Sequence, residues 1–490
     1  MKRKTRKKRS KKNRVINIIS RLVGVISIVI AIIFCIYIYK LDMLPNKYLK
    51  ILYISLLCIY VLLSLFAFPK HIKKKFKIFA IIIFILFSLV FGYGIKYADK
   101  TISFIDKIND ELKQQEEYQI KCLSSKKITK EKLDGKKIGI FKNNNYDKIV
   151  EKLKVKGNFD IVDYNDPIKL FEDLSEEKID LIIASDNVYQ LLSTELSYMQ
   201  LSLSVVDSVF VPIDKKDDII KIVDVTNTPF NIFIAGGDSY GDINKVMNTD
   251  VNMVVSMDVK NHKILLTSIP RDYYVLLAGM GDNAYDKLTH AGYYGVEESV
   301  KTVEKLLDTD INYYAKVNFS TIEKVVDAID GIEVDSDYAF RFYEPENGMD
   351  FTFTKGKNQL NGKRALAFAR ERQVFMDGDV QRVKNQQKVI SAIIEKITSS
   401  KTLIGNYTDL LDAISSSFVT NLDPKSINRI VQMQLSDMRG WTLESQNLDG
   451  YDSSSTSCYS IPYINLYVMK QDENSVKNAS EMIKNFLNRQ

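Results

Sequence analysis

The 490-residue chain has few of the residues on which several common enzyme classes depend. It contains four cysteines and three histidines, and no cysteine spacing is typical of a zinc site. With only His71, His262 and His290 available, a Ser–His–Asp arrangement is not expected. Cys122 and Cys458 lie beyond the apolar amino-terminal part, and nothing in the sequence indicates whether they pair. The chemistry must therefore be sought among carboxylates and basic side chains.

A glycine-rich phosphate loop is also missing from residues 136–213, and the chain shows no internal repeat. In this region strand-like segments (KKIGIF, FDIVDY, KIDLIIAS) alternate with helix-like segments (YDKIVEKLK, PIKLFEDL). This alternation predicts a small βαβ-type accessory domain with parallel strands. A polar, helix-prone stretch at residues 99–134 precedes it and is expected to form a stalk, so that stalk and accessory domain together occupy residues 99–225.

Hydropathy separates the first hundred residues from the rest. Residues 1–14 form a tail with ten Lys and Arg and no acid, and apolar runs follow at 15–39, 49–68 and 78–95. Each run is long enough, or nearly so, to cross a bilayer, which needs about 20 apolar residues. Basic tails and loops stay cytoplasmic, so we expect three transmembrane helices within residues 15–98, a cytoplasmic amino terminus in a multi-pass cell-membrane protein, and an extracellular remainder.

The net charge of +7 conceals an acidic exported part. Residues 1–77 contain 19 of the 68 Lys and Arg and one of the 61 Asp and Glu. The rest of the chain therefore has 49 basic and 60 acidic residues. The remainder thus carries a net charge of about −11, which argues against a general polyanion-binding surface. The basic tail adjoins an apolar span, which favours membrane anchoring over nucleic-acid binding. An anionic ligand would need a local arginine cluster.

Such a cluster occurs in the stretch ALAFARERQVFMDGDVQRVKNQQ. Arg370 and Arg372 are two residues apart in an alternating segment, so we expect them to share one face of a strand. Asp379, Arg382 and Gln386 follow with the spacing of one helix face. Guanidinium groups that point toward the start of a helix, where a carboxylate also lies, are suited to binding a phosphate ester and its metal ion. A surface salt-bridge cluster, with Asp379 as a helix cap, is the alternative interpretation.

A second domain, assigned to residues 226–490, has further polar residues at its strand ends. The segments NIFIAGG, VNMVVSMDV and KILLTSIP predict strands, and helices are expected at 296–307, 320–329 and 380–399. The first strand runs into the turn GGDSYG, for which an Asx-turn is the simpler reading. Asp250 precedes the second strand and would be either a cap or a ligand for a hard metal such as Mg²⁺. Arg271 and Asp272 follow the third strand.

These motifs resemble the LytR-CpsA-Psr family, and especially its capsule-attaching branch, over about residues 230–400. The matching stretches include NIFIAGGDSYG, TDVNMVVSMD, KILLTSIPRDYYV, LNGKRALAFARER and DGDVQRVKNQQKVI, in the family's order. The resemblance implies an α/β/α domain with a central mixed sheet. It also implies an extracellular phosphotransferase that moves a glycopolymer, such as a capsular polysaccharide or teichoic-acid-like polymer, from a polyprenyl-pyrophosphate carrier onto peptidoglycan. Mg²⁺ is the expected cofactor, and Mn²⁺ suits the same oxygen ligands.

The resemblance also assigns roles to individual residues. Asp250 and Asp379 would be the metal ligands. Asp272 would either orient Arg271 or act as a base toward the accepting sugar hydroxyl. The catalytic and pyrophosphate-binding side chains would be Arg271, Arg370, Arg372 and Arg382, with Gln386 beside them.

One position departs from the family pattern. The usual Arg-Ser-Asp is here Asn248-Thr249-Asp250, so Asn248 would contact the pyrophosphate without a charge. Loss of a charged hydrogen bond weakens binding by about 1.5–3 kcal/mol. We therefore expect weaker pyrophosphate binding, compensation by Lys245 or Lys287, or a different donor. The same substitution motivates the alternative of a non-catalytic protein that binds the lipid-linked polymer or regulates its use.

A lipid carrier would also require an apolar tunnel under the sheet. We expect this tunnel to be lined by Val296, Val300, Val303, Leu306, Leu307 and Phe319. The alternative for each of these side chains is ordinary packing in the hydrophobic core.

Overall fold

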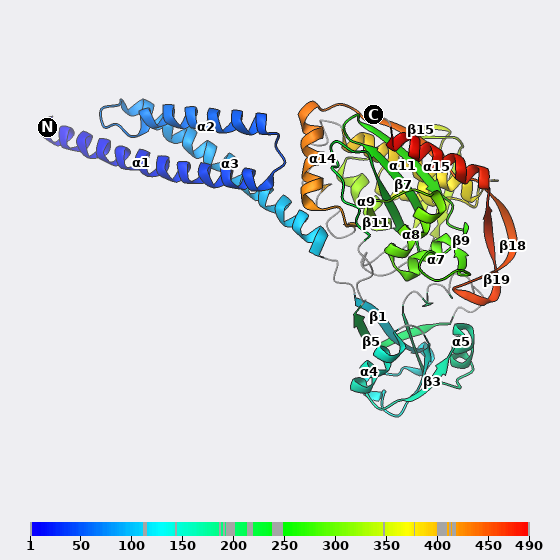
Figure 1. The fold of residues 1–490 in the computed structure, drawn as a ribbon. Coiled ribbons are helices and arrows are strands. Elements are labelled where there is room, and N and C mark those ends of the chain that lie inside the picture. The colour runs from blue at the N-terminus through cyan, green and yellow to red at the C-terminus, as the bar shows by residue number, and fades with distance from the viewer. Residues whose placement is uncertain are drawn as a thin grey trace.

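The computed structural model of this chain consists of a bundle of long helices, a small sheet domain and a larger sheet domain (Figure 1). The residues it describes are 2–110, 115–142, 145–185, 188–189, 192, 201–212, 219–237, 248–345, 348–376, 378–398, 409–410, 413 and 418–488.

The amino-terminal helices confirm the three predicted apolar spans. They are α1 (Lys2–Leu41), α2 (Asn46–Ala67) and α3 (Lys74–Asp110). The parts long and apolar enough to cross a membrane are Arg14–Leu41, Asn46–Ala67 and Lys74–Phe104. Ser27 and Tyr60 share a buried hydrogen bond of 2.8 Å between α1 and α2, the kind of polar contact that joins helices where no hydrophobic driving force exists.

The small domain confirms the predicted βαβ alternation and adds two strands to it. Its five-stranded sheet has the order β3-β2-β4-β1-β5, in which β2, β3 and β4 are parallel and β1 and β5 are antiparallel additions. The bounds are β1 (Gln115–Leu123), β2 (Lys137–Phe141), α4 (Tyr146–Lys156), β3 (Asp160–Tyr164), α5 (Pro167–Ser175), β4 (Leu181–Ser185) and β5 (Leu203–Pro212).

The prediction that residues 99–134 form only a polar, helix-prone stalk was wrong for β1, which lies between β4 and β5 in the sheet. Tyr118, Ile120 and Cys122 are buried on one face of this strand, a period-two signal within an otherwise polar sequence. Cys122 and Cys458 are both free and buried.

The larger domain has the predicted α/β/α layers around a six-stranded mixed sheet of order β16-β11-β6-β7-β8-β17. β6 pairs in parallel with β11, and β8 with β17, whereas β6, β7 and β8 form an antiparallel series. The strands are β6 (Phe230–Gly237), β7 (Val251–Asp258), β8 (Lys263–Ile269), β11 (Tyr313–Asn318), β16 (Phe418–Thr420) and β17 (Thr442–Asn447).

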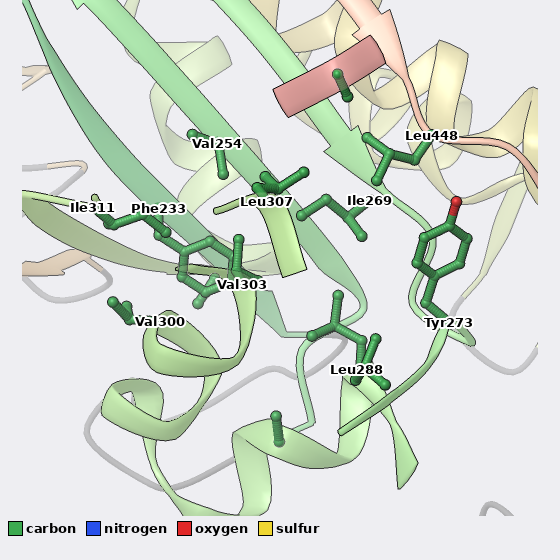
Figure 2. Close-up of a cluster of buried hydrophobic side chains, with 14 of the residues drawn as sticks. Phe233, Val254, Ile269, Tyr273, Leu288, Val300, Val303, Leu307, Ile311 and Leu448 are labelled. Carbon is green, nitrogen blue, oxygen red and sulfur yellow. The ribbon is translucent and has the colours of Figure 1, made fainter. Parts of the chain in front are cut away.

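One face of this sheet is covered by a solid hydrophobic core (Figure 2). Phe233 of β6, Val254 of β7 and Leu265 of β8 pack there against α8 (Val296–Leu307) and α15 (Glu473–Leu487). The expected tunnel lining on α8 was therefore wrong: Val296, Val300, Val303 and Leu307 belong to this core, with Leu306 packed against it. The side chain of Phe319 lies outside the described residues.

The opposite face is covered by α11 (Asp379–Ile397) and α14 (Pro424–Asp437), with α9 (Phe319–Ala328) and α10 (Gly362–Arg370) alongside. The prediction that ALAFAR forms a strand was wrong, because it belongs to α10. The Asn361 side chain accepts a hydrogen bond from the Arg364 backbone NH at 3.0 Å and so caps this helix. Residues 365–369 are all buried, and a short continuous buried run gives no period that distinguishes a helix from a strand.

Several short elements complete the domain. The serine-rich residues 453–457 lie in strand β18, which pairs with β19 in a long hairpin. The bounds are β9 (Tyr274–Leu276), β10 (Tyr285–Lys287), α7 (Leu288–Ala291), β12 (Ile332–Ser336), β13 (Phe340–Glu344), β14 (Met349–Phe353), β15 (Gly356–Leu360), β18 (Gly450–Cys458) and β19 (Ile461–Gln471).

The packing of α10 gives a stability prediction. Phe368 is fully buried against Phe340 and Phe353, so Phe368→Ala should lower the free energy of unfolding by about 3–5 kcal/mol. The matched control is Ile222→Ala, because Ile222 is 82% exposed and should shift stability by less than about 0.5 kcal/mol. Denaturant unfolding of the full-length protein in detergent, followed by circular dichroism, measures both. Equal losses in the two variants would contradict this packing.

Candidate active site

A cavity of about 800 Å³ lies between the central sheet and the helices of its second face. The alternation of β6 explains its wall: Phe233 and Ala235 point into the core on one face, while Ile232 and Ile234 face the cavity on the other. One end of the cavity is lined by charged and amide side chains and most of the rest by aliphatic ones. This volume is within the range of small-molecule binding pockets.

The register of β7 and β8 builds the first part of the polar end. Asn252 pairs with Ile269, so two residues further out Asp250 comes opposite Arg271. Arg271 Nη1 donates to Asp250 Oδ1 at 2.7 Å, and Arg271 Nε donates to Asp272 Oδ2 at 3.3 Å. Asp250 and Arg271 line the cavity, and Asp272 lies behind Arg271 with 9% of its surface exposed. Two carboxylates thus fix the direction of one guanidinium group.

The segment from β10 into α7 braces these two strand ends. Thr289 NH donates to the Arg271 carbonyl at 2.8 Å, and the Thr289 carbonyl accepts from Thr249 NH at 3.2 Å. Lys287, which is 5% exposed, places its Nζ 3.4 Å from Asp272 Oδ1. Of the two lysines expected to compensate for Asn248, Lys287 therefore lies at the site, and Lys245 lies outside the described residues.

The arginines after α10 form the second part of the polar end. Arg370 makes a bidentate pair with Glu344 of β13, with N–O distances of 2.9 and 3.0 Å. Arg372 follows the helix end, is exposed and also lines the cavity. Glu371 between them is buried and accepts from the Gln373 backbone NH at 2.7 Å, which holds the chain in its turn. The two arginines reach one site from a helix end and a loop, not from one strand face.

Helix α11 forms a wall that changes character along its length. Arg382 and Gln386 face the cavity at the polar end, as their spacing predicted. The same face continues with aliphatic residues over about 12 Å, at the α-helical rise of about 1.5 Å per residue. These residues are Val389, Ile390, Ile393, Ile394 and Ile397.

Six of the nine residues predicted for the site line this one cavity. The other three differ: Asp272 lies behind Arg271, half-buried Asn248 is not among the wall residues, and Asp379 begins α11 with a side chain outside the described residues. The turn GGDSYG is described only to Gly237, which lines the cavity together with Gly236. The six are Asp250, Arg271, Arg370, Arg372, Arg382 and Gln386.

Sequence reasoning missed Glu344 as the partner of Arg370 and placed the apolar wall on the wrong helix. The sequence did contain a signal for the wall, because aliphatic residues continue the helical spacing of Arg382 and Gln386 directly. Glu344 had no comparable signal, since its pairing with Arg370 spans 26 residues of chain.

The sequence model of the LytR_cpsA_psr family matches residues 203–479, which is more than half of the chain. The chain belongs to this family.

Among its relatives is the polyisoprenyl-teichoic acid–peptidoglycan teichoic acid transferase TagU of Bacillus cereus (strain AH820). The two are 39% identical over 195 residues, which are 40% of this chain and 61% of TagU. The chain thus spans less than two thirds of that relative's length. The transferase TagT of Bacillus subtilis (strain 168) is 32% identical over 246 residues, or 49% of this chain and 74% of TagT. The crystal structure of B. subtilis TagV covers 54% of this chain and 99% of its own, with 26% identity and a TM-score of 0.45.

In this family member, β10 also connects the site to the β18–β19 hairpin. Asp286, next to Lys287, is fully buried; His290 Nδ1 lies 2.6 Å from its Oδ1, and Ser460 NH donates to its Oδ2 at 2.7 Å. Burial acts to raise the pKa of Asp286, but His290 and Ser460 outweigh burial and hold that pKa below its ordinary value. The neighbouring Ile461 packs in the core of the small domain, so the hairpin joins the two domains.

This buried group gives a pH prediction. The pKa of Asp286 is lower in the folded state than its ordinary value. Asp286 therefore stabilises the fold when the pH is above the ordinary carboxyl pKa, and this stabilisation is lost as the pH falls through the pKa of the folded state. Asp286→Asn should lower stability by about 3–5 kcal/mol at pH 7. The difference from wild type should shrink as the pH falls below about 4.

Unfolding measured from pH 7 to pH 3 in detergent checks this expectation, with Asp282→Asn, an exposed carboxylate four residues away, as the control. A difference between wild type and Asp286→Asn that stayed constant with pH would contradict the ionised state of Asp286.

Proposed function

We propose that this protein is a phosphotransferase that moves a glycopolymer from a polyprenyl-pyrophosphate carrier to peptidoglycan and forms a phosphodiester. The observation that carries the proposal is the cavity, which has an arginine cluster at one end and an apolar interior. Such a site matches a molecule with a highly charged head and a long apolar tail. The relatives named as polyisoprenyl-teichoic acid–peptidoglycan transferases support the same substrate class.

The polar end has the groups that a pyrophosphate requires. Arg271, Arg370, Arg372 and Arg382 present guanidinium groups, which bind phosphate oxygens with paired hydrogen bonds. Phosphoryl transfer depends mainly on positioning and charge neutralisation, which such groups supply without covalent chemistry of their own. Gln386 adds a neutral amide donor on the α11 side of the cluster.

We also propose a divalent ion at this site. Among the described residues, no group of three or more His, Cys, Asp or Glu side chains could hold a metal ion. Mg²⁺ needs fewer protein ligands than that, because it commonly binds one or two carboxylates together with phosphate oxygens of the substrate. Asp250 on the cavity wall and Asp379 at the start of α11 would hold Mg²⁺ or Mn²⁺. The bound ion would neutralise charge on the two phosphates.

The proposed reaction is an exchange at one phosphorus atom. An acceptor hydroxyl of peptidoglycan attacks the phosphorus attached to the sugar and forms a new P–O bond. The bridging P–O bond breaks, polyprenyl phosphate leaves with the electron pair of that bond, and the proton of the hydroxyl passes to the leaving phosphate. Asp272 orients Arg271 in this scheme, because it contacts Arg271 and Lys287 from behind and is not on the cavity wall.

We place the reaction outside the cell. The basic first turns of α1 and the basic loop between α2 and α3 favour the cytoplasmic side. Three spans then put the α1–α2 turn and both sheet domains on the outer side. Peptidoglycan and an outward-facing lipid-linked polymer, of the capsular or teichoic-acid class, are accessible there.

A second candidate is a non-catalytic protein that binds the lipid-linked polymer, and it rests on Asn248. This residue precedes Asp250 by two positions and provides no charge where the family has arginine. Full complementation in cells by Asp379→Ala would favour this candidate over the enzyme.

The arginine cluster gives the prediction that tests the proposal. With a polyprenyl-pyrophosphate donor and Mg²⁺, Arg372→Ala should weaken binding by about 1.5–3 kcal/mol, or roughly 10- to 150-fold, and abolish turnover. The matched control is Arg341→Ala, since Arg341 is exposed, pairs with Asp350 and is outside the cavity wall. Donor binding and release of polyprenyl phosphate should be measured in parallel.

Asn248→Arg separates the two candidates in the same assay. Raised turnover in this variant supports an enzyme with a weakened donor site. Tight donor binding without turnover in wild type, Arg341→Ala and Asn248→Arg would contradict the enzyme and leave the binding protein.

A further inference from the structure

Helix α14 separates the apolar end of the cavity from the membrane helices. Ile430, Val431 and Leu435 on one side of the helix line the cavity. Gln434 Nε2 donates to the Thr398 carbonyl at 3.2 Å, so α14 lies at the carboxyl end of α11, away from Arg382. Asn428 and Gln432, on another side of the same helix, contact the turn between α1 and α2. Figure 1 shows α14 in orange beside the ends of the membrane helices that face the sheet domains.

The contact with the α1–α2 turn consists of specific hydrogen bonds. Asn428 Nδ2 donates to the Leu41 carbonyl at 3.0 Å, and Gln432 Nε2 donates to the Asp42 carbonyl and, at 3.3 Å, to Asp42 Oδ1. Asp42 has a positive φ of 47°, a conformation that is uncommon for non-glycine residues, although aspartate adopts it more readily than most. These bonds satisfy backbone carbonyls at the end of a membrane helix, where helices leave such groups without internal partners.

An apolar contact lies beside these bonds. Met43 of the turn and Phe104 of α3 are buried in one small cluster, against which Phe418 and Val431 pack. Phe418 and Val431 also line the cavity. The same two side chains therefore form the end of the cavity and touch the membrane anchor.

We propose that the membrane anchor completes the donor site by forming a portal between the cavity and the bilayer, through which the prenyl tail passes past Phe418 and Val431. This inference rests on the proposed function and assigns the α1–α2 turn a role in binding the lipid. A tail longer than the α11 wall must leave the cavity, and its exposure to water is unfavourable in proportion to the apolar area exposed. A portal at the anchor keeps the tail in an apolar environment from the arginine cluster to the bilayer.

The test compares two prenyl pyrophosphates of different length. Farnesyl pyrophosphate is the short probe and undecaprenyl pyrophosphate the long one, and the dissociation constant of each is measured for the full-length protein in lipid nanodiscs. Val431→Trp fills the proposed portal, so the ratio of the long-probe to the short-probe dissociation constant should rise about tenfold. Ser436→Trp is the matched control, because Ser436 is exposed on the same helix and is not a wall residue; its ratio should equal that of wild type.

A second variant removes the docking contacts without adding bulk. Asn428→Ala combined with Gln432→Ala should raise the same ratio several-fold in nanodiscs. Binding of the short probe shows that each variant is folded.

The possible outcomes distinguish the portal from the proposed function. An unchanged ratio in Val431→Trp, with both probes bound, would overturn the portal and leave the phosphotransferase proposal intact. Failure of wild type to bind either probe would overturn the proposed function and the portal with it. An equal rise in Ser436→Trp would also overturn the portal, because it would show that the chain-length effect does not depend on the cavity end.

Discussion

The arrangement of this protein depends on holding positive charge at the end of an apolar cavity. Guanidinium groups beside aliphatic walls are costly unless carboxylates compensate them. Asp250 and Asp272 hold Arg271 from two directions, and Glu344 holds Arg370 through two hydrogen bonds. The Asp250–Arg271 and Glu344–Arg370 pairs each join different elements, so the antiparallel β7–β8 register and the ends of α10 and β13 must all be correct for the cluster to exist.

The need to place positive charge at the end of an apolar cavity also explains why two helices, α11 and α14, form so much of the cavity wall. The cavity wall of α11 begins with Arg382 and Gln386 and continues with aliphatic residues, so one helix contributes to both ends of the cavity. Helix α14 closes the apolar end and hydrogen-bonds the α1–α2 turn. The opposite face of the sheet is solid core, which leaves one side for ligand binding and the other for stability.

Much of this could be predicted from the sequence, because the relevant signals were local. The three apolar spans, the βαβ alternation, α8 and the Arg382–Gln386 face of α11 all follow from runs or periods within a single segment. Residues 365–369 were misread as a strand because a short, continuously buried run has no period that distinguishes a helix from a strand. β1 was missed because its pairing partner β5 is about 90 residues away in the chain.

The position of the cavity could not be predicted in the same way. Both α8 and α11 have an apolar stripe, and a stripe does not show which face of the sheet its helix covers or whether the space beneath is filled. Contacts such as Arg370 with Glu344 and Lys287 with Asp272 depend on tertiary structure and have no local signal. The family pattern, in contrast, selected residues that the structure brings together, since six of the nine expected residues line one cavity. Their roles in binding and catalysis stay predictions.

The most direct test of the central claim follows a single phosphorus atom through the reaction. The donor is a polyprenyl-pyrophosphate-linked polymer with radioactive phosphorus only at the phosphate attached to the sugar, and the acceptor is peptidoglycan. The account predicts that the label becomes covalently bound to peptidoglycan while unlabelled polyprenyl phosphate is released. Label that appears only as free phosphate or on soluble polymer, with none in peptidoglycan, would contradict transfer by phosphodiester formation.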